Sequence, residues 1–175
     1  IPHLCVPIAL QAKDAQTGDW ITQVGVVLDP FCNELWTAIR GQPAKLNGTP
    51  IRVSQRRKLA EAIVSIGFAK SAETMRRTLP YFNNLVPKVR KIRMMGAAAL
   101  GMVYVASGRF DGYVEGGISL WDVCAGGLIL ECAGGEFWHQ PVVGDHKYKV
   151  CANNGLLRKA LQDIERKSAP SDIGA

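Results

Sequence analysis

Residues 121–135 read WDVCAGGLILECAGG, in which one carboxylate, Asp122, precedes a segment that is almost entirely apolar or small. Glu131 is the only charged residue after Asp122 in this stretch, which predicts a helix that is buried on most sides. The adjacent Gly126 and Gly127 would each cost about 1 kcal/mol relative to Ala inside a helix. We therefore expect other elements to approach the backbone of this helix closely at the two glycines.

Asp122 has two interpretations on the residue pattern alone. An Asp at the start of a helix is a typical N-cap, where its carboxylate accepts hydrogen bonds from the first backbone N–H groups and lies at the positive end of the helix dipole. A carboxylate is also the kind of hard oxygen ligand that Mg²⁺ prefers. The pattern predicts a structural cap or a metal ligand and leaves both open.

The rest of the chain alternates between predicted strands and helices, and from residue 88 onward the helices are nearly all apolar. Such helices indicate packing between or against sheets, a layered α/β architecture. Pro80 is expected to kink or end the helix that contains it. The predicted strands cover 4–10, 22–28, 34–39, 51–53, 62–68, 88–94, 111–115, 136–138 and 149–152, and the predicted helices cover 71–85 (capped by Ser71), 97–106, 121–133 and a final amphipathic segment capped by Asn153 or Asn154.

Composition places the chain among single-domain globular proteins. It has 175 residues, of which 47% are hydrophobic and 21% charged. No apolar run reaches the roughly 18 residues that span a bilayer. The five cysteines are an odd set without CxxC spacing, which favours reduced structural thiols in a cytoplasmic protein.

The net charge of +6 is concentrated in basic clusters at residues 56–58, 76–77 and 88–93. Such clusters can bind nucleic acid or other anionic partners. Aromatic residues do not alternate with the basic ones as a base-stacking platform requires. We therefore interpret the clusters as solvated surface, with an acidic partner as the alternative, and nucleic-acid binding is the weakest of these hypotheses.

The stretch 121–135 resembles the C-terminal signature of the inositol monophosphatase family. That signature consists of an aromatic residue, Asp, any residue, two or three small residues, an apolar run and Gly-Gly. The resemblance extends from about residue 8 to about residue 157 and implies an αβαβα sandwich that hydrolyses phosphomonoesters with Mg²⁺. Further matching segments, in the family's order and spacing, are GVVLDP (25–30), NELWTA (33–38), Gly41, LNG (46–48), IRVS (51–54), RMMGAAAL (93–100) and ASGRFDGY (106–113).

The resemblance implies site roles for five residues. Asp122 would be one Mg²⁺ ligand, for a second and weaker metal, and Glu115 would accept hydrogen bonds from substrate hydroxyls. Gly96, Ala97 and Ala98 match the substrate-contacting turn, where backbone N–H groups at a helix start bind phosphate or hydroxyl oxygens. The family usually has Ser or Thr at Ala97, so this chain lacks that hydroxyl. On the residues alone, tight helix–sheet packing explains Gly96 to Ala98, and an exposed strand end explains Glu115.

The family's other metal ligands come from a Gly-Glu-Glu-type segment and an Asp-Pro-x-Asp-Gly-Thr/Ser motif, and neither occurs in this sequence. Residues 29–33 (DPFCN) align with a hairpin turn instead. We therefore expect one domain over 1–175, the C-terminal portion of such a phosphatase with its N-terminal part absent, and inactive alone. The complete protein is expected to be a cytoplasmic homodimer that uses Mg²⁺ to hydrolyse inositol monophosphate or a related sugar phosphate. A non-catalytic protein that keeps the fold for association is the alternative.

Overall fold

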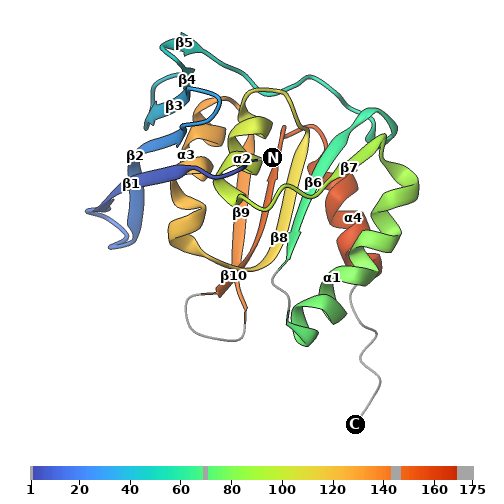
Figure 1. Ribbon diagram of the computed structural model, residues 1–175. Helices are drawn as coiled ribbons and strands as arrows, with labels where there is room; N and C mark the ends of the chain where they lie inside the picture. Colours follow the sequence, from blue (N-terminus) through green and yellow to red (C-terminus); the bar gives the residue numbers. More distant parts are fainter. Residues whose placement is uncertain (1, 69–70, 143–146, 169–175) are drawn as a thin grey trace.

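The computed structural model describes residues 2–68, 71–142 and 147–168. In this part of the chain two five-stranded sheets alternate with two pairs of helices (Figure 1). The order of layers is the first sheet, helices α2 and α3, the second sheet, and helices α1 and α4, which confirms the predicted layered α/β architecture. The helices are α1 (Ala72–Leu85), α2 (Ala98–Ala106), α3 (Cys124–Cys132) and α4 (Arg158–Ser168), and the short 3₁₀ turns are η1 (Leu59–Glu61), η2 (Val86–Lys88) and η3 (Leu120–Asp122).

The first sheet is antiparallel throughout and follows chain order. The turn after β2 forms because the Asp29 carboxylate accepts hydrogen bonds from the N–H groups of Phe31 (2.9 Å) and Cys32 (3.0 Å). The predicted role of Asp29 in a hairpin turn is therefore confirmed. The strands of this sheet are β1 (Val6–Lys13), β2 (Trp20–Asp29), β3 (Glu34–Ile39), β4 (Lys45–Leu46) and β5 (Thr49–Pro50).

The predicted strand over residues 51–53 is not observed; the segment follows a turn at Asn47 and Gly48, both of which have positive φ. The backbone N–H of Ile51 bonds to the Ala44 carbonyl, and that of Val53 bonds to the Ala133 carbonyl at the end of α3. These N–H groups therefore fix a connecting segment to the core and do not pair with a neighbouring strand.

The second sheet is mixed and has the order β7-β6-β8-β10-β9. Strand β6 is parallel to both β7 and β8, and the remaining pairs are antiparallel. Parallel strands of one sheet need crossover connections: α1 connects β6 to its neighbour β7, and α2 connects β7 to β8 on the other side of β6. The strands are β6 (Ile63–Phe68), β7 (Lys91–Arg93), β8 (Gly112–Ser119), β9 (Glu136–Pro141) and β10 (Lys147–Asn153).

Helix α3 is enclosed on several sides, as its glycines predicted. A Cβ atom added at Gly126 would lie 3.0 Å from the Cβ atom of Met102 in α2, and one at Gly127 would lie 2.5 Å from the Phe137 ring of β9. On the side of the first sheet, β2 approaches α3 at Gly25, where an added Cβ would lie 2.7 Å from a backbone oxygen of α3. The close approach expected at Gly126 and Gly127 is confirmed.

Helices α1 and α4 cover the other face of the second sheet. The Ser71 hydroxyl accepts a hydrogen bond from the Thr74 N–H, which confirms Ser71 as the N-cap of α1. Pro80 does not end α1, which was one of the two outcomes expected of it: the helix continues to residue 85 and buries Tyr81 and Leu85 in the core. No helix of the described residues is long and apolar enough to cross a membrane.

The first sheet presents an apolar outer face that no other described helix or strand covers (Figure 1). Successive side chains of a strand alternate between faces, and the strand pairing aligns the outward ones in rows. Ile8 and Leu10 are each 61% exposed. The outer face comprises Val6, Ile8 and Leu10 of β1, Val24, Val26 and Leu28 of β2, and Leu35, Thr37 and Ile39 of β3.

Candidate functional site

Asp122 lies just before α3 and does not cap it. The predicted helix over 121–133 is interrupted at Val123, whose φ of −126° and ψ of −16° depart from helical values. The Val123 N–H bonds to the Leu120 carbonyl and closes η3 before α3 begins at Cys124. No side chain caps α3, so the N-cap interpretation of Asp122 is wrong. Its half-buried carboxylate is left for another role.

Glu115 is half-buried inside β8 and not at an exposed strand end, because β8 continues to Ser119. Its carboxylate packs over Gly67 of the parallel strand β6, where an added Cβ would lie 2.5 Å from the Glu115 Cδ. The Tyr113 hydroxyl donates a hydrogen bond to Glu115 Oε2. Burial raises the pKa of Glu115, the Tyr113 hydrogen bond opposes this increase, and the nearby Asp122 charge adds to it.

The Asp122 charge interacts with groups around Glu115 and near the start of α2. The Asp122 charge contributes to raising the pKa values of Glu115, Tyr113 and Cys5, in each case after burial as the main cause. Cys5 in turn packs against the buried cluster that includes Ala99 and Leu100, in the first turn of α2. The predicted metal ligand, the predicted hydroxyl acceptor and the start of α2 therefore lie near one another.

The turn at Gly96, Ala97 and Ala98 begins α2 as predicted. Gly96 has φ +88°, a left-handed conformation that favours glycine. Ala97 has the extended backbone of an N-cap but supplies no capping side chain, and α2 starts at Ala98. The first N–H groups of a helix have no partner within it. This turn therefore offers backbone donors at the positive end of a buried helix.

The described residues do not form a complete metal site by themselves. They contain no group of three or more His, Cys, Asp or Glu side chains that could hold a metal ion. Mg²⁺ in proteins is commonly bound by one or two carboxylates together with waters and substrate phosphates. Asp122 fits one such ligand position, and further ligands would be needed to complete the site.

Sequence reasoning missed Tyr113 and Gly67 as neighbours of the Glu115 carboxylate. Tyr113 could have been identified from the sequence, because residues two apart in a strand share a face and Tyr113 lies two residues before Glu115. Gly67 carries none, since its position follows from the parallel register in which Gly67 pairs with Glu115.

A buried carboxylate, Asp111, fixes the start of β8. Its side chain is fully buried and accepts hydrogen bonds from the Ser54 hydroxyl, the Arg56 guanidinium (3.0 Å) and the Ile63 N–H (2.8 Å). Because Ile63 begins β6, Asp111 ties together the first residues of the two parallel strands that carry Gly67 and Glu115. We interpret Asp111 as structural support for the site.

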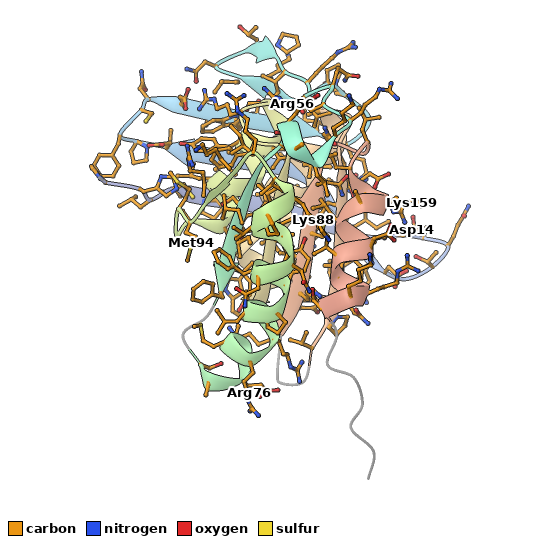
Figure 2. All side chains as sticks on the ribbon, turned by 90° about the vertical axis from the view of Figure 1, so that its right-hand side faces the viewer. Asp14, Arg56, Arg76, Lys88, Met94 and Lys159 are labelled. Atoms are coloured by element: carbon orange, nitrogen blue, oxygen red, sulfur yellow. The ribbon has the colours of Figure 1, made fainter. Side chains whose placement is uncertain are left out.

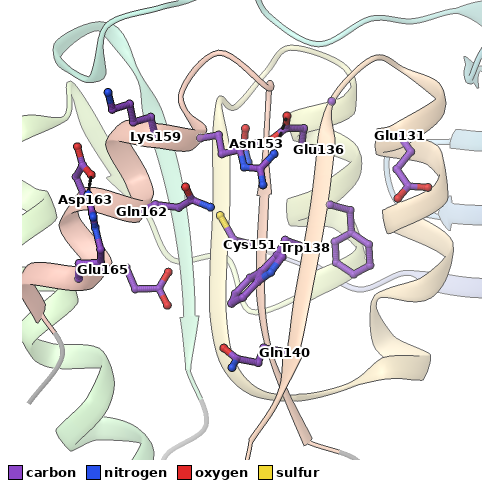
Figure 3. Close-up of a pocket in the computed structure, with 14 residues that line it drawn as sticks. Glu131, Glu136, Trp138, Gln140, Cys151, Asn153, Lys159, Gln162, Asp163 and Glu165 are labelled. Atoms are coloured by element: carbon purple, nitrogen blue, oxygen red, sulfur yellow. Dashed lines mark hydrogen bonds and ion pairs between the residues drawn. The ribbon is translucent and has the colours of Figure 1, made fainter.

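A surface hollow of about 740 Å³ lies away from these residues, between α4 and strands β9 and β10 (Figure 3). Trp138 and Cys151 line it, whereas none of the residues predicted for the site does. Its charged side chains largely neutralise one another, so it offers no clear surplus charge to an ionic ligand. Arg158 pairs with Glu136 and Arg166 with Asp163, and Glu165 pairs with Lys149, which lies outside the lining of the hollow.

Comparison with known proteins gives consistent matches. A model of the inositol monophosphatase family matches residues 1–167. Proteins named Nus factor SuhB from Pasteurella multocida and Haemophilus influenzae are 44% and 43% identical to this chain over 136 residues. Each alignment covers 77% of this chain and 49% of the relative. The chain thus spans about half the length of these curated relatives.

Solved structures show the same likeness. The extragenic suppressor protein SuhB of Bartonella henselae superposes with a TM-score of 0.80 at 33% identity, over 95% of this chain and 62% of that one. An inositol monophosphatase from Anabaena (Nostoc) superposes with a TM-score of 0.70 at 36% identity, over 84% of this chain and 58% of that one.

Proposed function

Because this chain belongs to the inositol monophosphatase family, we propose that its protein hydrolyses a phosphomonoester with Mg²⁺, and that the substrate is inositol monophosphate or a related sugar phosphate. Family membership supports a phosphatase-type function. The proposal rests on the interaction of the Asp122 charge with the Glu115 carboxylate and with Cys5, which packs against the buried cluster that includes Leu100 of α2.

The proposed metal role falls to Asp122. The family is generally Mg²⁺-dependent, and Asp122 is a half-buried carboxylate without a capping role. Bound Mg²⁺ would supply a Lewis acid that activates water and stabilises charge on the phosphate oxygens. Asp122 would hold one side of that ion, and ligands beyond this carboxylate would complete its coordination.

The proposed substrate contacts divide between backbone and side chain. Backbone N–H groups of the turn at Gly96, Ala97 and Ala98 would bind phosphate or hydroxyl oxygens at the start of α2. Glu115 would accept a hydrogen bond from a substrate hydroxyl. Tyr113 donates to Oε2, and we assign the ligand to Oε1.

We further propose that residues 1–175 act as one domain, that they correspond to the C-terminal portion of a larger phosphatase, and that the protein is a cytoplasmic homodimer. The alignments cover only 49% and 62% of the relatives, which fits a chain that is part of a larger protein. Sedimentation of the purified protein tests the homodimer, and a monomer at micromolar concentration would contradict it.

A second candidate function rests on the name of the relatives, Nus factor SuhB. In this alternative the protein acts as a Nus factor, and the fold serves association instead of hydrolysis. The net charge of +6 fits an anionic partner.

Phosphate release from inositol 1-phosphate, with and without Mg²⁺, tests the proposal on the product of the complete reading frame that contains these residues. Asp122→Asn should lower Mg²⁺-dependent turnover about 10²-fold or more, since a metal contributes several kcal/mol of transition-state stabilisation. Asp19→Asn, an exposed carboxamide substitution in the β1–β2 loop, is the matched control and should leave turnover unchanged.

Unaltered turnover in a folded Asp122→Asn variant would refute the ligand role. Failure of the unmodified protein to hydrolyse inositol 1-phosphate and other sugar phosphates would favour the second candidate.

A further inference from the structure

The middle of the chain is strongly segregated in charge. Between Glu73 and Asp111 there is no Asp or Glu at all. Charged segments of one sign repel one another, so they are costly unless solvent or a partner of opposite charge compensates them. The basic residues in this interval are Arg76, Arg77, Lys88, Arg90, Lys91, Arg93 and Arg109.

The fold brings part of this interval together with an earlier basic cluster. Strand β7 is an edge strand of the second sheet, and the N–H groups of Arg90 and Lys91 bond to the Ala62 carbonyl at 3.0 and 3.3 Å. Turn η1, whose Glu61 N–H bonds to the Lys58 carbonyl, ends directly before Ala62. We name the resulting group of exposed cations the basic edge. It comprises Arg57, Lys58, Lys88, Arg90, Lys91 and Arg93.

No ion pair joins the cations of the basic edge to a carboxylate of the described residues. The nearest acid in sequence is Glu61, and it forms no ion pair with them. By contrast, the ion pairs that the structure does contain involve Arg40, Arg56, Arg77, Arg109, Lys149, Arg158 and Arg166.

Figure 2 shows the side of the molecule that carries this edge. Lys88 lies beyond the C-terminal end of α1, and Arg76 lies toward the opposite end of that helix. Met94 follows the last residue of β7. The basic edge is therefore a local surface at one end of α1, separate from the basic pair at the other end.

Composition alone makes nucleic-acid binding the weakest interpretation of these clusters, but the fold brings cations of two of them together without ion-pair partners among the described residues. We propose that the basic edge binds the phosphate backbone of double-stranded nucleic acid without reading its sequence. A linear polyanion can neutralise several of the six cations at once, whereas a single phosphomonoester can contact only one or two. Arginine forks match phosphate oxygens in bidentate geometry, and three of the six residues are arginines. The edge contains no aromatic residue, which argues against base stacking on single strands and against a protein interface with an aromatic-rich centre.

The expected strength of the interaction follows from counterion release. Six phosphate contacts predict a slope of log K against log salt of roughly −5. Between about 50 and 200 mM salt, affinity should therefore fall about 10³-fold. Loss of two contacts would reduce the slope to roughly −3.5 and the fall to about 10²-fold.

Fluorescence anisotropy with labelled duplexes of about 20 base pairs, one DNA and one RNA of arbitrary sequence, tests the proposal on the full chain. The test variant is K91E/R93E, which reverses two cations of the basic edge. The control variant is R76E/K159E, which makes the same change of net charge at exposed residues elsewhere (Figure 2). We expect the test variant to lose at least about 10-fold in affinity at 50 mM salt and to show the smaller slope, and the control to keep the steep slope.

Several results would overturn the proposal. These are absence of duplex binding at 50 mM salt, equal losses in the two variants, and tighter binding to polyglutamate or to anionic lipid vesicles than to duplexes. Thermal unfolding establishes that each variant is folded. If K91E/R93E does not fold, K91Q/R93Q removes the same two charges without introducing acids, and an unchanged salt slope in that variant overturns the proposal equally.

Discussion

Replacing Gly67 with Ala tests the position of the Glu115 carboxylate directly. The new Cβ would lie 2.5 Å from the Glu115 Cδ, so the carboxylate must move. Moving it breaks the hydrogen bond from Tyr113, and such a bond to a charged acceptor contributes about 1.5–3 kcal/mol. Ala also reduces the conformational entropy of the unfolded chain relative to Gly, which offsets about 0.4–1 kcal/mol of this loss. The net expected loss is about 1–2 kcal/mol, or about 2–8 °C in Tm for a chain of this length.

Urea and thermal unfolding of two further variants make this prediction specific. Gly116→Ala is the matched control in β8, because its Cβ would meet only Thr78 Oγ1 at 4.0 Å. We expect this variant to be as stable as the unmodified protein or slightly more stable. In a Glu115→Ala background, Gly67→Ala should no longer destabilise the protein, which gives a coupling energy of about 1.5–3 kcal/mol between the two positions. Equal losses in both backgrounds, or a Gly67→Ala variant as stable as Gly116→Ala, would refute the described contact.

Three other substitutions have clear expectations. Ala97→Ser should stabilise the protein by about 1 kcal/mol, because Ala97 has N-cap geometry without a capping side chain, and a Tm increase of about 2–4 °C checks this. Burial raises the pKa of Glu115 above its ordinary 4.5, so the folded state holds this proton more tightly and the free energy of unfolding should fall as pH rises from about 4.5. In Glu115→Gln that fall should be smaller, as urea titrations in EDTA would show. Asp111→Ala should cost about 1.5–3 kcal/mol, because it removes a buried carboxylate and leaves its part-buried hydrogen-bond partners unpaired, and a Tm decrease under about 3 °C would contradict that estimate.

The local features of the fold could be predicted from the sequence because they depend on neighbouring residues. Ser71 caps α1 through a hydrogen bond three residues away, and Asp29 closes its turn in the same way. The paired glycines of α3 predicted close packing, since few other reasons explain two glycines inside a buried helix.

The strand predicted over residues 51–53 and the helix end predicted at Pro80 were wrong for a different reason. Long-range contacts outweighed local preference there. Ile51 and Val53 have strand-forming side chains, yet their N–H groups bond to the Ala44 and Ala133 carbonyls. Pro80 lacks a donor for its own turn, but burial of Tyr81 and Leu85 keeps α1 continuous.

The candidate site divides in the same way. Asp122, Glu115 and the turn at Gly96 were identified through a family resemblance, whereas their mutual proximity required the fold. The contact between Gly67 and Glu115 depends on a parallel register between strands almost fifty residues apart in sequence. Sequence periodicity contains no information on that register.

The apolar outer face of the first sheet has a consequence for how this chain behaves in solution. Water-facing hydrocarbon of this extent promotes association, and sulfate and similar salts strengthen it by salting out apolar surface. The basic edge responds in the opposite direction, because added ions compete for its contacts with a polyanion. We therefore expect increasing sulfate to release nucleic acid from the chain and to promote association between copies of the chain. In one titration, the anisotropy of a labelled duplex should fall while light scattering rises.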